Sequence, residues 1–178
     1  LAMHNYESTF TTFPNAGDAE ASDAPEPKYR HSWRVLILPY IDQAPLYNEY
    51  RFDEPWDSDH NKQFIDRMPP IFKCEGVEDP TKTSVHVFTG PGSPFAENKA
   101  PKFREFTDGL SNTLLVVEAG PETAEIWTKP GGLDFDPEDP LQALGDIGET
   151  FLILLGDGTV RNLPKTMEAE TLRKLIQC

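Results

Sequence analysis

The chain has 178 residues and a formal net charge of −14 at pH 7, from 30 acidic and 16 basic residues. This excess of negative charge opposes binding to phosphate backbones and anionic lipids, so we expect no nucleic-acid partner. The length suits one domain built around one core. No stretch reaches the roughly 18 consecutive apolar residues that a membrane span needs, and the N-terminus shows no signal-peptide pattern.

The first residues predict the last turns of a helix that began upstream. We expect this helix end to occupy residues 1–12 and Pro14 to stop it. Any membrane anchor or targeting segment would then lie in a segment absent from this chain. Residues 15–29 contain almost nothing to bury, which predicts a mobile surface loop. Apolar side chains at near-helical spacing carry the helix prediction: Leu1, Met3, Tyr6 and Phe10.

The segment from Ser32 to Ile41 carries no charge after Arg34 and is apolar enough to be buried. Ser32 can cap a helix here, and Pro39 should kink or end it. A strand is the competing prediction, because periodicity alone cannot assign a short apolar run. We prefer the helix, because the apolar residues that follow favour a helical pair. These residues are Leu46, Tyr47 and Tyr50.

Alternating and β-branched runs after Cys74 predict five strands. Gly156-Asp157-Gly158 separates the last two, and its Asp-Gly pair can adopt the positive φ angles of a hairpin turn. Thr166 can cap a closing helix. The sequence thus predicts an α+β fold, with helices from the N-terminal half packed on an antiparallel sheet from the C-terminal half. The predicted strands span 83–89, 113–118, 124–128, 150–155 and 159–163.

Cys74 and Cys178 are the only cysteines, too few for a disulfide framework or a Cys-based zinc site. A single disulfide between them stays open, since it requires Cα atoms within about 7 Å. We favour a buried Cys74 that behaves as a small apolar residue, with an unpaired thiol at the C-terminus.

The loop from Asp53 to His60 alternates acidic residues, as calcium-binding loops do. It lacks the Gly and the bidentate Glu of an EF-hand. We favour a structural interpretation, in which Asp57 or Ser58 caps a third helix and Trp56 plugs the core. That helix should end at the following Pro-Pro pair.

A second acidic cluster later in the chain offers oxygen ligands for calcium. The alternative is a solvated turn anchored by Phe135, whose backbone two prolines stiffen. We favour the turn, because such loops bind calcium only when the carboxylates converge. The sequence implies no other cofactor. The four candidate ligands are Asp134, Asp136, Glu138 and Asp139.

Residues 107–113 include Ser111, a conceivable hydrolase nucleophile. The segment lacks the G-x-S-x-G pattern, and a triad would need a histidine from elsewhere. A turn explains the same residues, with Asp108 and Asn112 bonded to their own backbone. His86, a lone histidine among apolar neighbours, is expected to be a satisfied structural group. We therefore predict no enzymatic activity.

Several sequence blocks follow one another in a specific order. They are Leu1-Ala2-Met3-His4-Asn5-Tyr6, Ser32-Trp33-Arg34, Asp53-Glu54-Pro55-Trp56-Asp57-Ser58-Asp59-His60-Asn61, Phe72-Lys73-Cys74, Thr107-Asp108-Gly109-Leu110-Ser111-Asn112-Thr113, Trp127-Thr128-Lys129-Pro130 and Gly156-Asp157-Gly158. This order resembles a planctomycete family of domains of unknown function that commonly follow a prepilin-type cleavage and methylation segment. The resemblance covers almost the whole chain. Family members often carry a His ten residues before the terminal Asp-Gly, where this chain has Ile147.

The resemblance implies a pilin-like domain in the periplasm or at the cell surface, anchored by or fused to an upstream segment. Our leading hypothesis is a non-enzymatic, pseudopilin-like structural domain that assembles through protein contacts in a filament or secretion machine. Major pseudopilins of type II secretion hold calcium in a late acidic loop, a part that 134–139 would play here. An extracytoplasmic binding module for a cation or small solute is the alternative, and a hydrolase is third. The terminal hairpin could face a partner through Leu152, Leu154 and Val160.

Overall fold

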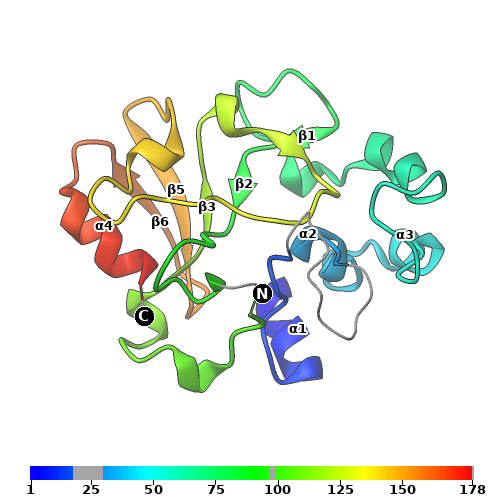
Figure 1. Ribbon diagram of the computed structural model, residues 1–178, viewed down its shortest axis with the longest axis horizontal. Helices are drawn as coiled ribbons and strands as arrows, with labels where there is room; N and C mark the ends of the chain where they lie inside the picture. Colours follow the sequence, from blue (N-terminus) through cyan, green and yellow to red (C-terminus); the bar gives the residue numbers. More distant parts are fainter. Residues whose placement is uncertain (18–29, 97–98, 178) are drawn as a thin grey trace.

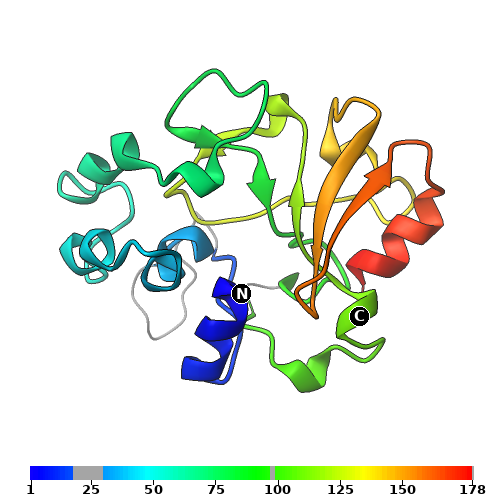
Figure 2. The same ribbon diagram turned by 180° about the vertical axis from the view of Figure 1, so that it is seen from behind.

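The computed structural model describes residues 1–17, 30–96 and 99–177 (Figure 1). It confirms an α+β fold, with helices mainly in the N-terminal half and antiparallel strands in the C-terminal half. Helices α2 and α3 lie at one end of the molecule and α4 at the other in both views (Figures 1 and 2). No helix in the described part of the chain is long and apolar enough to cross a bilayer.

The N-terminal half consists of short helices rather than long ones. Ser32 caps α2 as predicted, because its hydroxyl accepts the Arg34 N–H at 3.2 Å. Pro39 then converts the chain into a 3-10 turn, so the helical prediction is confirmed and the competing strand is wrong. The helices are α1 (Ala2–Phe10), α2 (Trp33–Leu36) and α3 (Ala44–Glu49), with 3-10 helices at Leu38–Ile41, Asn61–Arg67 and Pro70–Phe72.

Four strands form the main sheet in the order β2-β3-β5-β6, and β1 pairs with β4 in a small second sheet. The predicted strand 83–89 is therefore divided between the two sheets. The β5–β6 hairpin is confirmed: the Asp157 carboxylate accepts the Thr159 N–H at 2.9 Å, and Gly158 has φ 88°. The strands are β1 (Lys82–Thr83), β2 (Val85–His86), β3 (Leu114–Glu118), β4 (Glu125–Ile126), β5 (Thr150–Leu155) and β6 (Val160–Pro164).

Strand β3 is buried on both faces, which explains its unbroken apolar sequence. A register shift between Leu114 and Val116 lets Leu115 and Val116 enter the same core, because a bulge turns neighbouring side chains to one side. That core contains the N-terminal helices and Trp127. A second core lies between the sheet and α4 (Ala169–Ile176) and contains Phe151, Ile153, Leu155, Leu172 and Ile176.

Of the two predicted caps, the one at Asp57 or Ser58 forms at Ser58, and the one at Thr166 does not form. Asp57 is exposed, and it is Ser58 whose hydroxyl accepts the Asn61 N–H at 3.0 Å where the third helix begins. That helix is a 3-10 helix, with a tighter turn than the predicted α-helix. The prediction for Thr166 is wrong, since α4 has Glu168 at its N-cap and no side-chain cap bond.

The predicted core position of Trp56 is also wrong, because this indole is only half-buried. Trp127 fills the core instead and is fully buried, with its Nε1–H donated to the Ile65 carbonyl oxygen at 3.0 Å. Its ring stacks on Phe72 at a centroid distance of 6.1 Å. The possible Cys74–Cys178 disulfide lies partly outside the described residues, which contain Cys74 as a free thiol, half-buried rather than buried, but not Cys178. Residues 18–29 of the predicted mobile loop also lie outside them.

We predict that Trp127→Ala destabilises the protein by about 3–5 kcal/mol, since the residue is fully buried and its loss leaves a cavity. Denaturant titration measures this change. The matched control is Trp56→Ala, which should cost less than half as much because that indole already contacts water. Equal losses of stability in the two variants would contradict the assignment of Trp127, rather than Trp56, to the core.

Candidate functional site

The loop from Asp53 to His60 is held by the side chain of Asn61, which is fully buried. Its Oδ1 accepts the Arg51 N–H at 3.1 Å, and its Nδ2 donates to the carbonyl oxygens of Arg51 and Pro55 at 2.8 Å each. One amide therefore closes the loop from the inside. Asp53 lies exposed on its outside. His60 Nε2 lies 2.9 Å from the carbonyl oxygen of Glu49, the last residue of α3, so the imidazole links the loop to this helix.

The second acidic loop bonds to its own backbone. Asp134 accepts the Phe135 N–H at 3.0 Å, and Asp136 accepts the Glu138 N–H at 2.9 Å. Glu138 points to Arg173 on α4, 3.6 Å away. Within the described ranges, no three His, Cys, Asp or Glu side chains form a group that could hold a metal ion. The structure thus does not bring Asp134, Asp136, Glu138 and Asp139 together as ligands.

Ser111 is exposed and bonds to the Asp157 carboxylate in the β5–β6 turn. The Thr159 N–H, with this hydroxyl, lowers the pKa of Asp157. Asn112 Nδ2 donates to the Asp108 carbonyl oxygen at 2.9 Å, as the turn interpretation predicts. Among the described residues, no contact joins Ser111 to a histidine. The segment is therefore a turn that supports the hairpin.

The most unusual polar group of the structure is a fully buried guanidinium that sequence analysis did not single out. Arg34 is 0% exposed, and its Nε donates to the Val85 carbonyl oxygen at 3.0 Å. Its Nη2 lies 3.4 Å from a Glu125 carboxylate oxygen and 3.2 Å from His86 Nδ1. Helix α2, strand β2 and strand β4 thus converge on one cation. The sequence block Ser32-Trp33-Arg34 does not predict this burial, since an Arg beside an apolar run is usually exposed.

His86 is 1% exposed and is held between two charges of opposite sign. Its Nδ1 accepts from Arg34, which leaves the proton on Nε2, 3.2 Å from the Thr123 carbonyl oxygen. Burial lowers the pKa of His86, and the Arg34 cation adds to this effect against the opposing pull of Glu125. Burial alone would raise the pKa of Glu125, but the Arg34 and Lys129 cations help to lower it. The cluster is thus assembled from a neutral histidine and one ion pair.

We predict that the protein loses stability as the pH falls below about 6.5, the ordinary pKa of histidine. A native pKa below the unfolded value means that the unfolded state binds more protons, so protonation favours unfolding. His86→Gln should reduce the slope of unfolding free energy against pH by up to about 1.4 kcal/mol per pH unit. His31, whose pKa burial also lowers, should contribute separately, so the double variant should show the flattest profile. An unchanged slope in His86→Gln would contradict this assignment.

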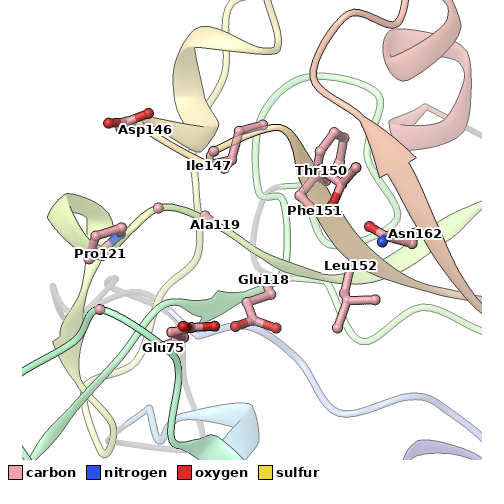
Figure 3. A pocket seen from close by; sticks show the side chains of 13 residues that line it. Glu75, Glu118, Ala119, Pro121, Asp146, Ile147, Thr150, Phe151, Leu152 and Asn162 are labelled. Carbon is pink, nitrogen blue, oxygen red and sulfur yellow. The ribbon is translucent and has the colours of Figure 1, made fainter.

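A pocket of about 480 Å³ lies where β3 ends and β5 begins, lined by Glu118 and Leu152 from the face opposite α4 and by Phe151 and Ile147 from the core that contains α4 (Figure 3). Glu118 of β3 and Glu75 point into it, and Asp146 lies at its rim. Leu152 and Asn162 extend it across β5 to β6. Ile147, at the position where the resemblance leads one to expect His, forms part of its apolar wall. The pocket therefore combines carboxylates with apolar surface, and it was not predicted from the sequence.

Strand β6 is the edge of the main sheet, next to this pocket. Hydrogen bonds Leu155 N–H to Thr159 O and Lys165 N–H to Glu149 O place the odd-numbered residues of β6 in bonded pairs with β5. Antiparallel strands alternate bonded and non-bonded pairs. The N–H and C=O groups of Val160 and Asn162, and the carbonyl of Pro164, therefore point away from the sheet.

The family model described as a protein of unknown function, DUF1559, matches residues 1–94 and 76–150. The chain belongs to this family. Comparison with curated proteins gave no match, and neither did comparison with solved structures. The buried cluster of Arg34, His86 and Glu125 lies within the part matched to DUF1559, whereas β6 follows it.

Proposed function

We propose that this DUF1559 protein is a non-enzymatic, pilin-like domain of the cell envelope that works by binding other proteins. The observation that carries the proposal is the edge strand β6, with its outward-facing backbone groups. Val160 on this strand is 63% exposed, and Leu152 beside it on β5 is 44% exposed. Unpaired edges with exposed apolar side chains are templates for another strand, and most proteins cover or blunt them.

Two features of β6 favour selective pairing over indiscriminate aggregation. Arg161 adds a charge to the strand, and Pro164 ends it. The proline costs nothing within the hairpin, because position 164 faces away from β5 and needs no N–H there. The edge thus offers about three residues of backbone to a partner.

A hydrolase built on Ser111 is not part of the proposal, since a serine nucleophile needs a base and none contacts Ser111 among the described residues. The location outside the cytoplasm rests on the resemblance to domains that follow prepilin-type segments. Assembly in a filament or secretion machine rests on the same resemblance together with the open edge.

A second candidate function is an extracytoplasmic binding module for a small solute. The pocket of about 480 Å³ favours it, because ligand pockets fall in this size range and combine apolar walls with a few polar groups. Its carboxylates would select a cationic solute.

We predict that Val160→Glu removes the protein from large assemblies of the cell envelope, because a charge on the edge blocks strand pairing. Sedimentation of gently solubilised envelopes measures the size of these assemblies. The matched control is Ile71→Glu, since Ile71 is also 63% exposed but lies in a 3-10 helix far along the chain from β6. All three proteins should melt at the same temperature.

The wild type and Ile71→Glu should sediment as large particles, and Val160→Glu as a free protomer. A wild-type protein that occurs only as a free protomer would contradict the proposal, as would a Val160→Glu variant that still assembles.

A further inference from the structure

The two faces of the β5–β6 hairpin differ in what covers them. Phe151, Ile153 and Leu155 are buried against α4. The opposite face, which we call the open face, carries Leu152 paired with Asn162 and Leu154 paired with Val160. Leu152, Val160 and Asn162 are exposed, whereas Leu154 is half-buried against the core that contains the N-terminal helices. The edge of β6 therefore adjoins the acidic pocket, which Leu152 and Asn162 help to line (Figure 3).

The pocket on this surface has unbalanced negative charge. Asp146 is paired with Lys165, whose Nζ lies 3.4 Å from its carboxylate. Glu75 and Glu118 have no ion-pair partner among the described residues, and no Lys, Arg or His side chain lines the pocket. The whole chain adds a net charge of −14. A partner that enters this pocket is therefore expected to be cationic.

From this geometry we infer that the open face and the edge of β6 together bind an extended basic segment of a partner protein. The segment adds to β6 as an antiparallel strand, and one of its Lys or Arg side chains enters the acidic pocket. This inference rests on the proposed protein-binding function and names the chemistry of the partner.

The register of β6 fixes which residues of the segment are recognised. Residues opposite Asn162 and Val160 would bond to their outward N–H and C=O groups, and their side chains would lie on the open face. The side chain beside Asn162 meets the pocket, so it is basic. The side chain two positions further along meets Val160 and Leu154, so it is apolar. The preferred motif is therefore basic, any residue, apolar.

The reach of a long cationic side chain suits this arrangement. Strands lie about 4.8 Å apart, so a segment paired with β6 lies three spacings, or roughly 14 Å, from Glu118 on β3. A Lys or Arg stem that lies over Asn162 and Leu152 spans about half of this gap with apolar contact, and it enters the pocket on the Asn162 side, where the carboxylates attract its charge.

Other occupants fit the surface less well. A second copy of this chain would bring its own charge of −14 against the same carboxylates. A small solute would fill the pocket but leave the backbone groups of Val160 and Asn162 unpaired. Only an extended basic segment satisfies the edge, the apolar face and the pocket together.

The test uses the whole 178-residue chain and a fluorescein-labelled ten-residue peptide with Lys-Thr-Val at its centre, with binding followed by fluorescence anisotropy. Replacing this lysine by glutamate, or replacing both pocket carboxylates in Glu75→Gln/Glu118→Gln, should weaken binding by roughly tenfold or more. Added salt should weaken it as well, because the attraction is between charges.

Backbone pairing is tested separately from charge. Asn162→Pro removes an outward N–H while leaving the bonds to β5 intact, so it should fold and lose roughly tenfold in affinity, whereas Asn162→Ala retains binding. N-methylation of the peptide at Lys and Val should abolish binding, because those N–H groups face β6. N-methylation at the intervening Thr should not. The peptide pair keeps the test valid even if Asn162→Pro does not fold.

The inference is overturned if the peptide does not bind, if the glutamate peptide binds equally well, or if the position of N-methylation makes no difference. It is also overturned if free spermidine displaces the peptide at equal concentration, which favours the small-solute module, or if the chain alone forms a dimer that Asn162→Pro dissolves. If the peptide does not bind but Val160→Glu still prevents assembly, the protein-binding function stands and its partner is not a basic segment. If the peptide does not bind and Val160→Glu still assembles, the proposed function is contradicted as well.

Discussion

The burial of the Arg34 guanidinium is the constraint on which the rest of the structure depends. A cation without water must find acceptors in the protein, and removing one partner of such a group typically costs about 3–5 kcal/mol. Arg34 takes its acceptors from Ser32 in its own helix cap, Val85 in β2 and Glu125 in β4. The N-terminal helices, the main sheet and the small sheet are thereby held to one another at a single point.

This constraint extends to the candidate binding surface. Val85, whose carbonyl oxygen accepts from Arg34, pairs with Glu118 in the β2–β3 ladder. The position of Glu118 in the pocket therefore follows from the register that Arg34 helps to fix. The hairpin then pairs with β3 on the other side, with Val117 opposite Ile153. Buried polar and apolar contacts thus fix the strand register in the interior, while the outer edge of β6 remains unpaired in the described structure.

The sequence predicted the parts of this fold that depend on local chemistry. Ser32 as a cap, Pro39 as a helix breaker and the Asp157-Gly158 turn all act within a few residues, so the pattern alone located them. Trp56 and Trp127 could not be ranked in this way, because burial of an indole depends on what the rest of the chain places around it. Asn61 was likewise overlooked, since its role requires the backbone of a loop that precedes it.

The candidate site was harder to predict, because only the tertiary structure brings its residues together. Arg34, His86 and Glu125 are far apart in the chain, and only the meeting of α2, β2 and β4 makes them a cluster. Glu75, Glu118 and Asp146 likewise come from separate segments. The exposed hairpin was predicted, because Leu152 and Val160 lie on strands whose alternation is visible in the sequence. The acidic pocket beside the hairpin was not predicted, since no sequence pattern links its carboxylates to β6.

We propose that β6 is an open edge that becomes paired when the protein acts. Amide hydrogen exchange, resolved by residue, measures this directly in the isolated protein and in envelope assemblies. In the isolated protein, Val160 and Asn162 should exchange much faster than Arg161 and Leu163, whose N–H groups face β5. In the assembly all four should be protected. Equal protection of the four amides in the isolated protein, or rapid exchange at Val160 and Asn162 in the assembly, would contradict the account.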